Sequence, residues 1–528
     1  MYFDVVIKGG LCYLGDGGDP VRSDVGIVGS RIEAIGDLND AQTGLSVDAA
    51  GKVVCPGFVD THSHSDLVVL KEPAVENKVM QGVTTELIGQ DGMSLAPIIP
   101  EYREPWKKTM GSLEGHYDVP WDWQTAEEYF ERIDSQDLGP NIAYLVPHGN
   151  IRLCVMGLDD REATDDEMAK MSRLLAKILE AGAYGMSTGM IYPPCCYAPT
   201  QEFVELCKVL KDADGLFVTH QRNESDYILE AMDEIFEIGA KSGCRVHFSH
   251  FKVGGKRNWD KLDTVLAKLD EANLSGIPLS FDQYPYIAGS TMLGVILPPW
   301  VHNGGTEKAL ERLADKNKRE QMKTDIAKGI PGWDNFVSAN GVENIYVTFV
   351  KTDKNSKYVG KTLLEIGKMA NKDPLDATFD LLYEEEMTAG LVHFYGKEEH
   401  ISKIMQREEQ NFCTDGILGA HPHPRVYGTY PRVLGKYVRE NKDLTMSQAI
   451  HKMTGKPASV LRLEKRGLLK EGYYADVVVF DPETVIDKAT YDNPKQYPEG
   501  IEHVFVNGVQ VVEKGVCKPA KAGRLLRK

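Results

Sequence analysis

The feature that most constrains the fold is an alternation of short apolar runs with amphipathic segments through the middle of the chain. Eight runs have the length of buried strands, at 52–58, 83–88, 142–146, 184–187, 216–219, 245–249, 279–281 and 411–414. Helical patterns separate them; Thr164 and Glu167, for example, form a capping box that predicts a helix over 165–181. Eight repeats of this kind favour an α/β fold, a (β/α)8 TIM-like barrel, over a doubly wound sheet.

The two ends of the chain have a different pattern. Strand-like runs at 3–8, 25–28 and 31–35 near the N-terminus resemble runs at 475–480, 503–506 and 509–512 near the C-terminus. We therefore expect a small β-sandwich domain formed by 1–54 and 465–528, around a catalytic barrel at 55–464. The charged, turn-rich stretch at about 298–342 interrupts the barrel rhythm and predicts an insertion near the barrel mouth.

Composition narrows the range of partners and locations. Lys and Arg number 60 against 78 Asp and Glu, a net charge of −18, which disfavours nucleic acid and anionic membranes as partners. The chain has no apolar run of membrane-spanning length, and its first residues lack the basic segment of a signal peptide. We expect a cytoplasmic protein whose nine cysteines are reduced thiols.

Four histidines follow three of the predicted strands. In a barrel these positions lie at the C-terminal rim, where the active sites of such enzymes are found. His62 and His64 share one face of an extended segment, and His220 and His250 end the fifth and sixth strands. A His-x-His pair alone could be a packed pair, but four rim imidazoles predict one or two bound metal ions. Asp415, after the eighth strand, is predicted to ligate a metal and to transfer a proton.

The order of the candidate ligands and several longer segments resemble those of a known enzyme family. The order of the four histidines and Asp415 resembles the amidohydrolase superfamily. Longer matches resemble its N-acyl-D-amino-acid deacylase (D-aminoacylase) family, and they are 82–86 (GVTTE), 186–194 (MSTGMIYPP), 249–253 (SHFKV), 282–286 (DQYPY), 288–291 (AGST), 421–425 (HPHPR) and 472–479 (GYYADVVV). The resemblance covers nearly the whole chain and implies a metal-dependent barrel enzyme.

One position departs from the family pattern. Where the family usually has a metal-binding Cys in a Gly-x-Cys-Gly turn after the second strand, this chain has Asp91, which is predicted to replace that ligand. A carboxylate can bridge two ions and is a harder ligand than a thiolate. We expect one or two divalent ions, zinc first, with manganese, cobalt or iron as alternatives. The fourth strand carries no Lys that could be carbamylated as in hydantoinase-like relatives, so Asp91 is the available bridging group.

The resemblance also implies a site for the substrate carboxylate. Lys252, Arg425, Tyr192 and Tyr284 are the groups expected to bind it, with Ser290 as a further candidate. His148, after the third strand, is a candidate for substrate contact or an ordinary rim histidine. The segment at 291–297 is mostly apolar and carries no cation, which favours a substrate with an apolar or neutral side chain.

These observations predict an enzyme that hydrolyses N-acyl-D-amino acids to a carboxylate and a free D-amino acid. The predicted partner is a small N-acylated amino acid, and the sequence leaves a homo-oligomer open. One alternative is a cyclic-amide or dipeptide hydrolase of the same superfamily. An alternative of another class is a catalytically inactive barrel scaffold, which would be free to lose the metal ligands that this chain retains.

Overall fold

The centre of the molecule is a parallel eight-stranded sheet. The computed structural model describes residues 2–115, 117–518 and 520–528. The strands are ordered β17-β13-β12-β11-β10-β9-β8-β6, and every pair is parallel. Their bounds are β6 Phe58–Asp60, β8 Val83–Ile88, β9 Asn141–Pro147, β10 Gly185–Gly189, β11 Leu216–His220, β12 Arg245–Phe248, β13 Leu279–Gln283 and β17 Gln410–Phe412.

A short pairing joins the two edges of this sheet. β7 (Ser63–His64), which continues from β6, pairs in parallel with β18 (Gly416–Ile417), which continues from β17. The backbone N–H of Asp415 also donates to the carbonyl of His62 over 2.8 Å. The predicted (β/α)8 TIM-like barrel is therefore confirmed, and His62, His64 and Asp415 of the predicted rim cluster take part in closing it.

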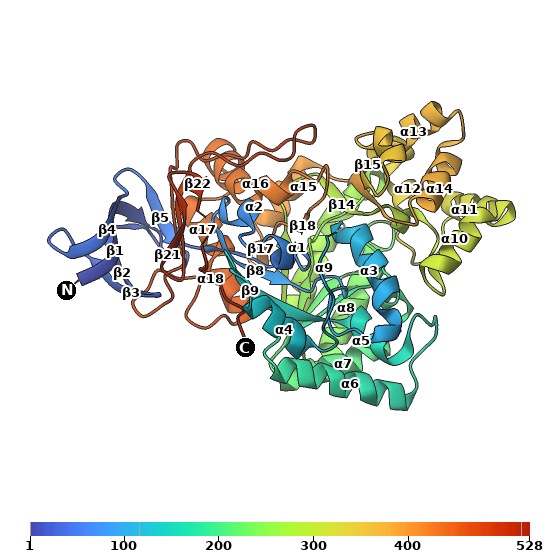
Figure 1. Ribbon diagram of the computed structural model, residues 1–528, viewed down its shortest axis with the longest axis horizontal. Coiled ribbons are helices and arrows are strands. Elements are labelled where there is room, and N and C mark those ends of the chain that lie inside the picture. Colours follow the sequence, from blue (N-terminus) through green and yellow to red (C-terminus); the bar gives the residue numbers. More distant parts are fainter. Residues whose placement is uncertain (1, 116, 519) are drawn as a thin grey trace.

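Helices surround the barrel in the order that the alternating pattern predicts. They include α4 (Ala126–Asp134), α6 (Asp165–Glu180), α7 (Thr200–Asp212), α8 (Ile228–Ser242) and α9 (Leu262–Leu274), which cover one side of the barrel in Figure 1. Thr164 and Glu167 form the predicted capping box at the start of α6. No helix among the described residues combines the length and the apolar character needed to traverse a membrane.

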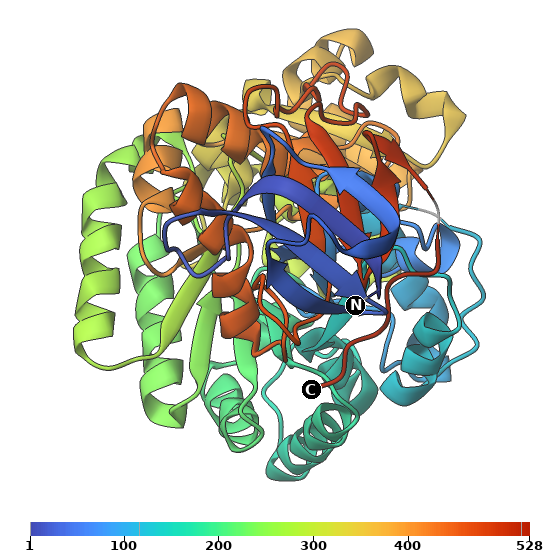
Figure 2. The same cartoon turned by 90° about the vertical axis from the view of Figure 1, so that its left-hand side faces the viewer.

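The two ends of the chain build one nine-stranded sheet. It joins β1 (Tyr2–Cys12), β2 (Val21–Val28), β3 (Arg31–Gly36), β4 (Gln42–Asp48) and β5 (Val53–Pro56) to β19 (Val477–Phe480), β20 (Ile501–Val506), β21 (Val509–Glu513) and β22 (Val516–Cys517). β5 pairs with β19 antiparallel, so the two ends meet in the middle of the sheet. Figure 2 shows this unit facing the viewer in front of the barrel. The predicted first barrel strand at 52–58 is therefore wrong in its bounds. Most of that run is β5, which belongs to the nine-stranded sheet, and the first barrel strand, β6, begins at Phe58.

The additional structure near the barrel mouth is larger than the sequence predicts. A three-stranded antiparallel sheet, β14-β16-β15, combines Ala288–Met292, Ala389–Phe394 and Ile345–Val350. In sequence, five helices separate these strands: α10 (Thr306–Ala314), α11 (Lys316–Lys328), α12 (Phe336–Asn340), α13 (Leu363–Ala370) and α14 (Pro374–Glu384). Figure 1 shows them at the right of the molecule. This unit has a hydrophobic cluster of its own, which includes Leu313 and Leu382. The unit extends beyond the predicted insertion at 298–342, because β14 precedes that stretch in sequence and β15 and β16 follow it.

Candidate metal centre and substrate cavity

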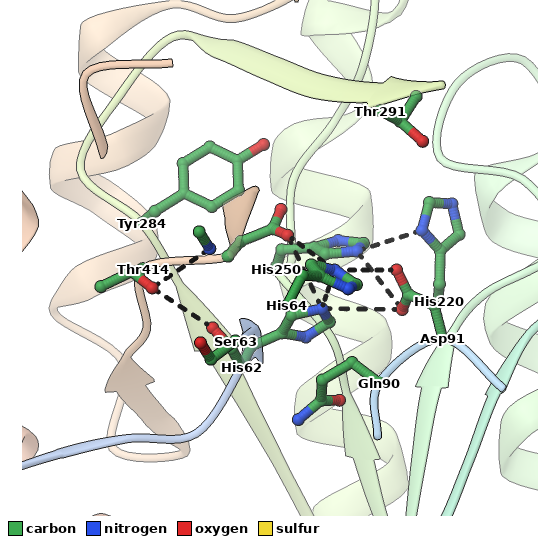
Figure 3. Close-up of polar contacts among 12 residues, drawn as sticks. His62, Ser63, His64, Gln90, Asp91, His220, His250, Tyr284, Thr291 and Thr414 are labelled. Carbon is green, nitrogen blue, oxygen red and sulfur yellow. Dashed lines mark hydrogen bonds and ion pairs between the residues drawn. The ribbon is translucent and has the colours of Figure 1, made fainter. Parts of the chain in front are cut away.

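The six predicted metal-binding side chains come together at one end of the barrel. Each lies at or just after the C-terminal end of a barrel strand, so the parallel sheet brings them to the same rim. They are buried, and they are His62, His64, Asp91, His220, His250 and Asp415. Figure 3 shows the imidazole rings pointing toward one another and toward the carboxylate of Asp91. Sequence positions more than 350 residues apart thus form one cluster of nitrogen and oxygen atoms.

One half of the cluster contains the His-x-His pair. The Nε2 atoms of His62 and His64 are 3.3 Å apart. Asp415 Oδ1 lies 3.6 Å from the first and 3.3 Å from the second. Asp91 reaches the same pair through both oxygens, with Oδ1 3.7 Å from His62 Nε2 and Oδ2 3.6 Å from His64 Nε2. Both imidazole nitrogens therefore lie within 3.7 Å of a carboxylate oxygen of Asp91 and of Asp415.

The other half contains His220 and His250. His220 Nδ1 lies 3.0 Å from His250 Nε2, and Asp91 Oδ1 lies 4.0 Å from the same Nε2 atom. Asp91 therefore stands between the two halves. Glu224, which sequence reasoning missed, joins this half, with its carboxylate 3.7 Å from His220 Nε2 and 3.2 Å from His250 Nδ1. The four-residue spacing from His220 was a signal, but the intervening loop has no periodicity that orients the side chain.

The chemistry of the cluster fits a divalent cation. Imidazole nitrogens within 3.3 Å of one another cannot all donate, and they require a shared proton or a cation between them. Three groupings of side chains place their ligand atoms within 4.8 Å: His62 with Asp91 and His250, His62 with His64 and Asp415, and His220 with Glu224 and His250. Asp91 Oδ1 and His220 Nε2 are buried and have no hydrogen-bond partner among the residues that the structure describes. Nitrogen and carboxylate donors of this kind suit zinc and similar ions.

Backbone conformation distinguishes three residues of the cluster. Asp91, His250 and Asp415 have φ angles of 54°, 36° and 47°, in the left-handed region that side-chain-bearing residues seldom adopt. Such conformations cost of order 1–3 kcal/mol each and concentrate at functional sites. Strand ends at the rim thus turn sharply to aim a carboxylate or imidazole into the cluster.

The electrostatics of the cluster favour a cation. Burial raises the pKa of the Asp415 carboxyl, but Arg425 and then the neighbouring histidines outweigh it and hold that pKa well below its ordinary range. Burial lowers the pKa of His62, yet Asp91 and Asp415 raise it to about 9. At neutral pH the carboxylates of Asp415 and Asp91 are therefore ionised, and their negative charge stabilises a protonated imidazole or a metal ion beside them.

A cavity of about 330 Å³ opens above the cluster. Its wall contains five of the six predicted substrate-binding residues: Lys252, Arg425, Tyr192, Tyr284 and Ser290. The Arg425 side chain is fully buried, with Nη1 2.8 Å from Asp415 Oδ2 and Nη2 donating to the Ser290 carbonyl over 3.1 Å. Lys252 pairs with Glu224 over 2.6 Å. Two fixed cations thus lie beside the ligand cluster, as an anionic substrate requires.

His148 lies elsewhere. It does not line the cavity, and both of its ring nitrogens have partners: Thr188 Oγ1 at 3.1 Å and Glu202 Oε1 at 2.8 Å. Arg152 pairs with Glu202 over 2.6 Å, which completes a buried network beneath the rim. Packing and hydrogen bonding account for His148, so we do not retain it as a substrate-binding residue.

A larger apolar pocket of about 1050 Å³ adjoins this cavity. The two share Tyr192 and Phe336 in their walls. Its lining is mostly aliphatic and aromatic, and among the described residues it includes Asp334 and His302 but no Lys or Arg. Burial lowers the pKa of His302 to about 4, so this ring is neutral at pH 7. The pocket offers space beside the cavity without a cation to neutralise an acidic group.

Comparisons with known proteins agree with this geometry. The sequence matches the amidohydrolase family over residues 46–328 and 403–512. It is 37% identical to the N-acyl-D-glutamate deacylase of Alcaligenes xylosoxydans xylosoxydans, covering 99% of this chain and 96% of the relative. It is 34% identical to the D-aminoacylase of the same organism, covering 99% and 97%. The crystal structure of N-acyl-D-glutamate deacylase from Bordetella bronchiseptica, complexed with zinc and a phosphonate mimic of the tetrahedral intermediate, is 32% identical over both full chains with a TM-score of 0.84.

The chain belongs to the amidohydrolase family. Within it, the full-length similarity places the chain with the N-acyl-D-amino-acid deacylases, as the sequence motifs predict. A solved D-aminoacylase that is 33% identical, with a TM-score of 0.83 over both full chains, contains a binuclear metal centre.

Proposed function

We propose that this protein is a metal-dependent N-acyl-D-amino-acid deacylase that prefers substrates with an apolar side chain. The observation that carries the proposal is the juxtaposition of a carboxylate–imidazole cluster with two fixed cations, Lys252 and Arg425, in one cavity. The cluster suits attack on an amide, and the cations suit the free carboxylate that every N-acyl amino acid carries.

The cluster offers two positions for divalent ions. His62, His64 and Asp415 would hold one ion, and His220 and His250 would hold another, with Asp91 between them. A divalent ion held by these residues would supply Lewis-acid chemistry, lowering the pKa of water and polarising the amide carbonyl. Zinc is the proposed ion because imidazoles predominate, and the oxygen donor at Asp91 extends the choice to manganese, cobalt or iron.

Asp415 is the proposed proton carrier. One carboxylate oxygen faces the two imidazoles of the His-x-His pair, and the other forms an ion pair with Arg425 Nη1 over 2.8 Å. The ionised group takes a proton from the attacking water, whose oxygen bonds to the amide carbon. It then delivers the proton to the leaving nitrogen as the C–N bond breaks. The products are a carboxylate and a free amino acid.

The substrate is held by its α-carboxylate. Lys252 and Arg425 supply charge, and the hydroxyls of Tyr192 and Tyr284 lie in the same wall. The side chain would enter the adjoining apolar pocket, where the absence of Lys and Arg among the described lining residues disfavours D-glutamate and D-aspartate.

A substrate panel with metal analysis tests the proposal. The chain should hydrolyse N-acetyl-D-leucine, -methionine or -phenylalanine well above the L-enantiomers, N-acetyl-D-glutamate and cyclic imides, and should contain at least one ion per chain. Met292→Arg places a cation in the apolar pocket and should shift preference toward N-acetyl-D-glutamate, whereas Met292→Leu should not. Activity restricted to L-substrates or cyclic imides would refute the proposal; a preference for long acyl chains alone would reassign the pocket to the acyl group.

A further inference from the structure

Glu224 occupies a fixed position between the metal cluster and the carboxylate-binding side of the cavity. It follows β11 by four residues, and its backbone is held on both sides. Its N–H donates to Asp334 Oδ2 over 3.1 Å, and its carbonyl accepts from Gly254 N–H over 2.7 Å. The residue is only 4% exposed. The insertion near the mouth and the loop after β12 therefore both position this carboxylate.

The Glu224 side chain contacts two residues with different tasks. Its Oε1 lies 3.2 Å from His250 Nδ1 and 2.8 Å from Lys252 Nζ, and its Oε2 lies 2.6 Å from the same Nζ. His250 presents its other nitrogen, Nε2, to His220 and Asp91. Lys252 is one of the two cations proposed to bind the substrate carboxylate.

These contacts cannot all be hydrogen bonds at once. Lys252 Nζ lies 2.8 Å from His250 Nδ1, so Nδ1 can accept from the ammonium or donate to Glu224, but not both. A neutral imidazole that ligates a metal through Nε2 carries its proton on Nδ1. Ligation by His250 therefore excludes the bond to Lys252 and leaves Glu224 Oε1, 3.2 Å away, as the acceptor for the Nδ1 proton. Metal-ligating histidines commonly donate their second nitrogen to a carboxylate in this way.

We propose that Glu224 is a positioning residue that links the metal-binding cluster to the carboxylate-binding side of the cavity. It accepts the Nδ1 proton of His250, which leaves Nε2 free as a ligand. Its pairing with the Lys252 ammonium competes with the contact between that ammonium and Nδ1 and keeps Lys252 in the cavity wall. This inference rests on the proposed function for the role of Lys252. Its metal-binding half depends only on the geometry of Glu224, His250 and Lys252.

A double-mutant cycle on metal affinity tests the proposal without substrate. Glu224→Gln removes the charge that retains Lys252, so the ammonium can bond to His250 Nδ1 and favour the tautomer that cannot ligate. Affinity for cobalt(II), measured by competition with a chromogenic chelator, should fall about 10- to 100-fold. Lys252→Met alone should leave affinity nearly unchanged, and adding it to Glu224→Gln should recover most of the loss.

The visible spectrum of the cobalt(II)-loaded protein distinguishes positioning from direct ligation. At saturating cobalt(II), Glu224→Gln should keep the wild-type spectrum, because the first coordination shell is intact. A changed spectrum without rescue by Lys252→Met would make Glu224 a ligand itself and overturn the proposal. So would an affinity within twofold of the wild type. If Glu224→Gln does not fold, Glu224→Asp enters the same cycle, with a smaller loss and the same rescue expected.

Glu234→Gln is the matched control. Glu234 is a partly buried carboxylate on α8 that pairs with Arg222 over 2.9 Å and contacts none of the cluster histidines. Its loss removes the same charge from the same part of the chain and should leave cobalt(II) affinity unchanged. A second readout concerns the substrate: the preference in kcat/KM for N-acetyl-D-leucine over its C-terminal amide should fall in Glu224→Gln. An inactive wild-type protein would refute the proposed function while the metal cycle still decides the role of Glu224.

Discussion

Replacing Asp415 by Asn should separate chemistry from stability in this site. The substitution keeps the shape of the side chain but removes its capacity to take a proton. Positioned acid–base groups contribute about 10²- to 10⁴-fold to rate, so we expect kcat to fall by that factor. At about 1.4 kcal/mol for each tenfold, the activation barrier rises by roughly 3–5 kcal/mol.

The same substitution should also destabilise the fold, because it leaves Arg425 buried without its carboxylate. Arg425 is fully buried and lies 2.8 Å from Asp415 Oδ2. Breaking a buried ion pair costs about 3–5 kcal/mol. The Ser290 carbonyl at 3.1 Å and the ring of Tyr284, 4.5 Å from the guanidinium carbon, remain as partners and should reduce that cost.

Glu202→Gln provides the matched comparison. Glu202 is a buried carboxylate that pairs with Arg152 over 2.6 Å but does not line the cavity. Urea unfolding should reveal a similar loss of stability in both variants. Steady-state assays with excess zinc should show a large fall in kcat only for Asp415→Asn, with metal content retained through the other ligands. A kcat within tenfold of the wild type for Asp415→Asn, or an equal fall for Glu202→Gln, would refute the assignment.

Three further outcomes are expected. Asp91→Cys should shift metal preference toward zinc over manganese, because a thiolate is a softer ligand than a carboxylate. Competition titrations with the two ions measure this preference. An unchanged preference would show that Asp91 is not a ligand. Lys252→Ala should raise KM for N-acetyl-D-leucine about 10- to 100-fold through the loss of a charge-assisted hydrogen bond, with a smaller effect on kcat; an unchanged KM would remove its carboxylate role. Burial, reinforced by Lys252, lowers the pKa of His393 to about 3, below the value of 6.5 for an ordinary histidine. As the pH falls, His393 therefore takes up a proton in the unfolded chain before it does so in the folded protein. The free energy of unfolding should fall by up to about 2 kcal/mol between pH 6.5 and 5 for this reason. Urea titrations at both pH values should show that His393→Asn removes this contribution.

The barrel and most of its rim could be predicted from the sequence because the signals are local. A buried parallel strand appears as a short apolar run, and the polar residues directly after it must lie at the carboxyl edge of the sheet. His220 and His250 illustrate this rule, since each lies at or just after the end of its strand. Strand position alone therefore predicts that these side chains lie at one rim of the barrel.

Other features depend on contacts between distant segments. β5 and β6 are separated by one residue, yet β5 pairs with β19 and β6 with β8, and a single apolar run does not reveal that division. The three-stranded sheet near the mouth likewise combines β14 with strands that follow it by more than fifty residues. Such pairings depend on tertiary packing, which local periodicity does not encode.

The four histidines and Asp415 were determined by the sequence, because strand ends and family motifs both mark them. The tertiary structure alone decided what lies between them. It placed Asp91 between the two histidine pairs, with Oδ1 3.7 Å from His62 Nε2 and 4.0 Å from His250 Nε2. In the tertiary structure, His148 lies in a buried hydrogen-bond network with Glu202, and Glu224 lies between His250 and Lys252. Loop side chains take these positions through contacts with other loops, so their direction is fixed only when the barrel closes.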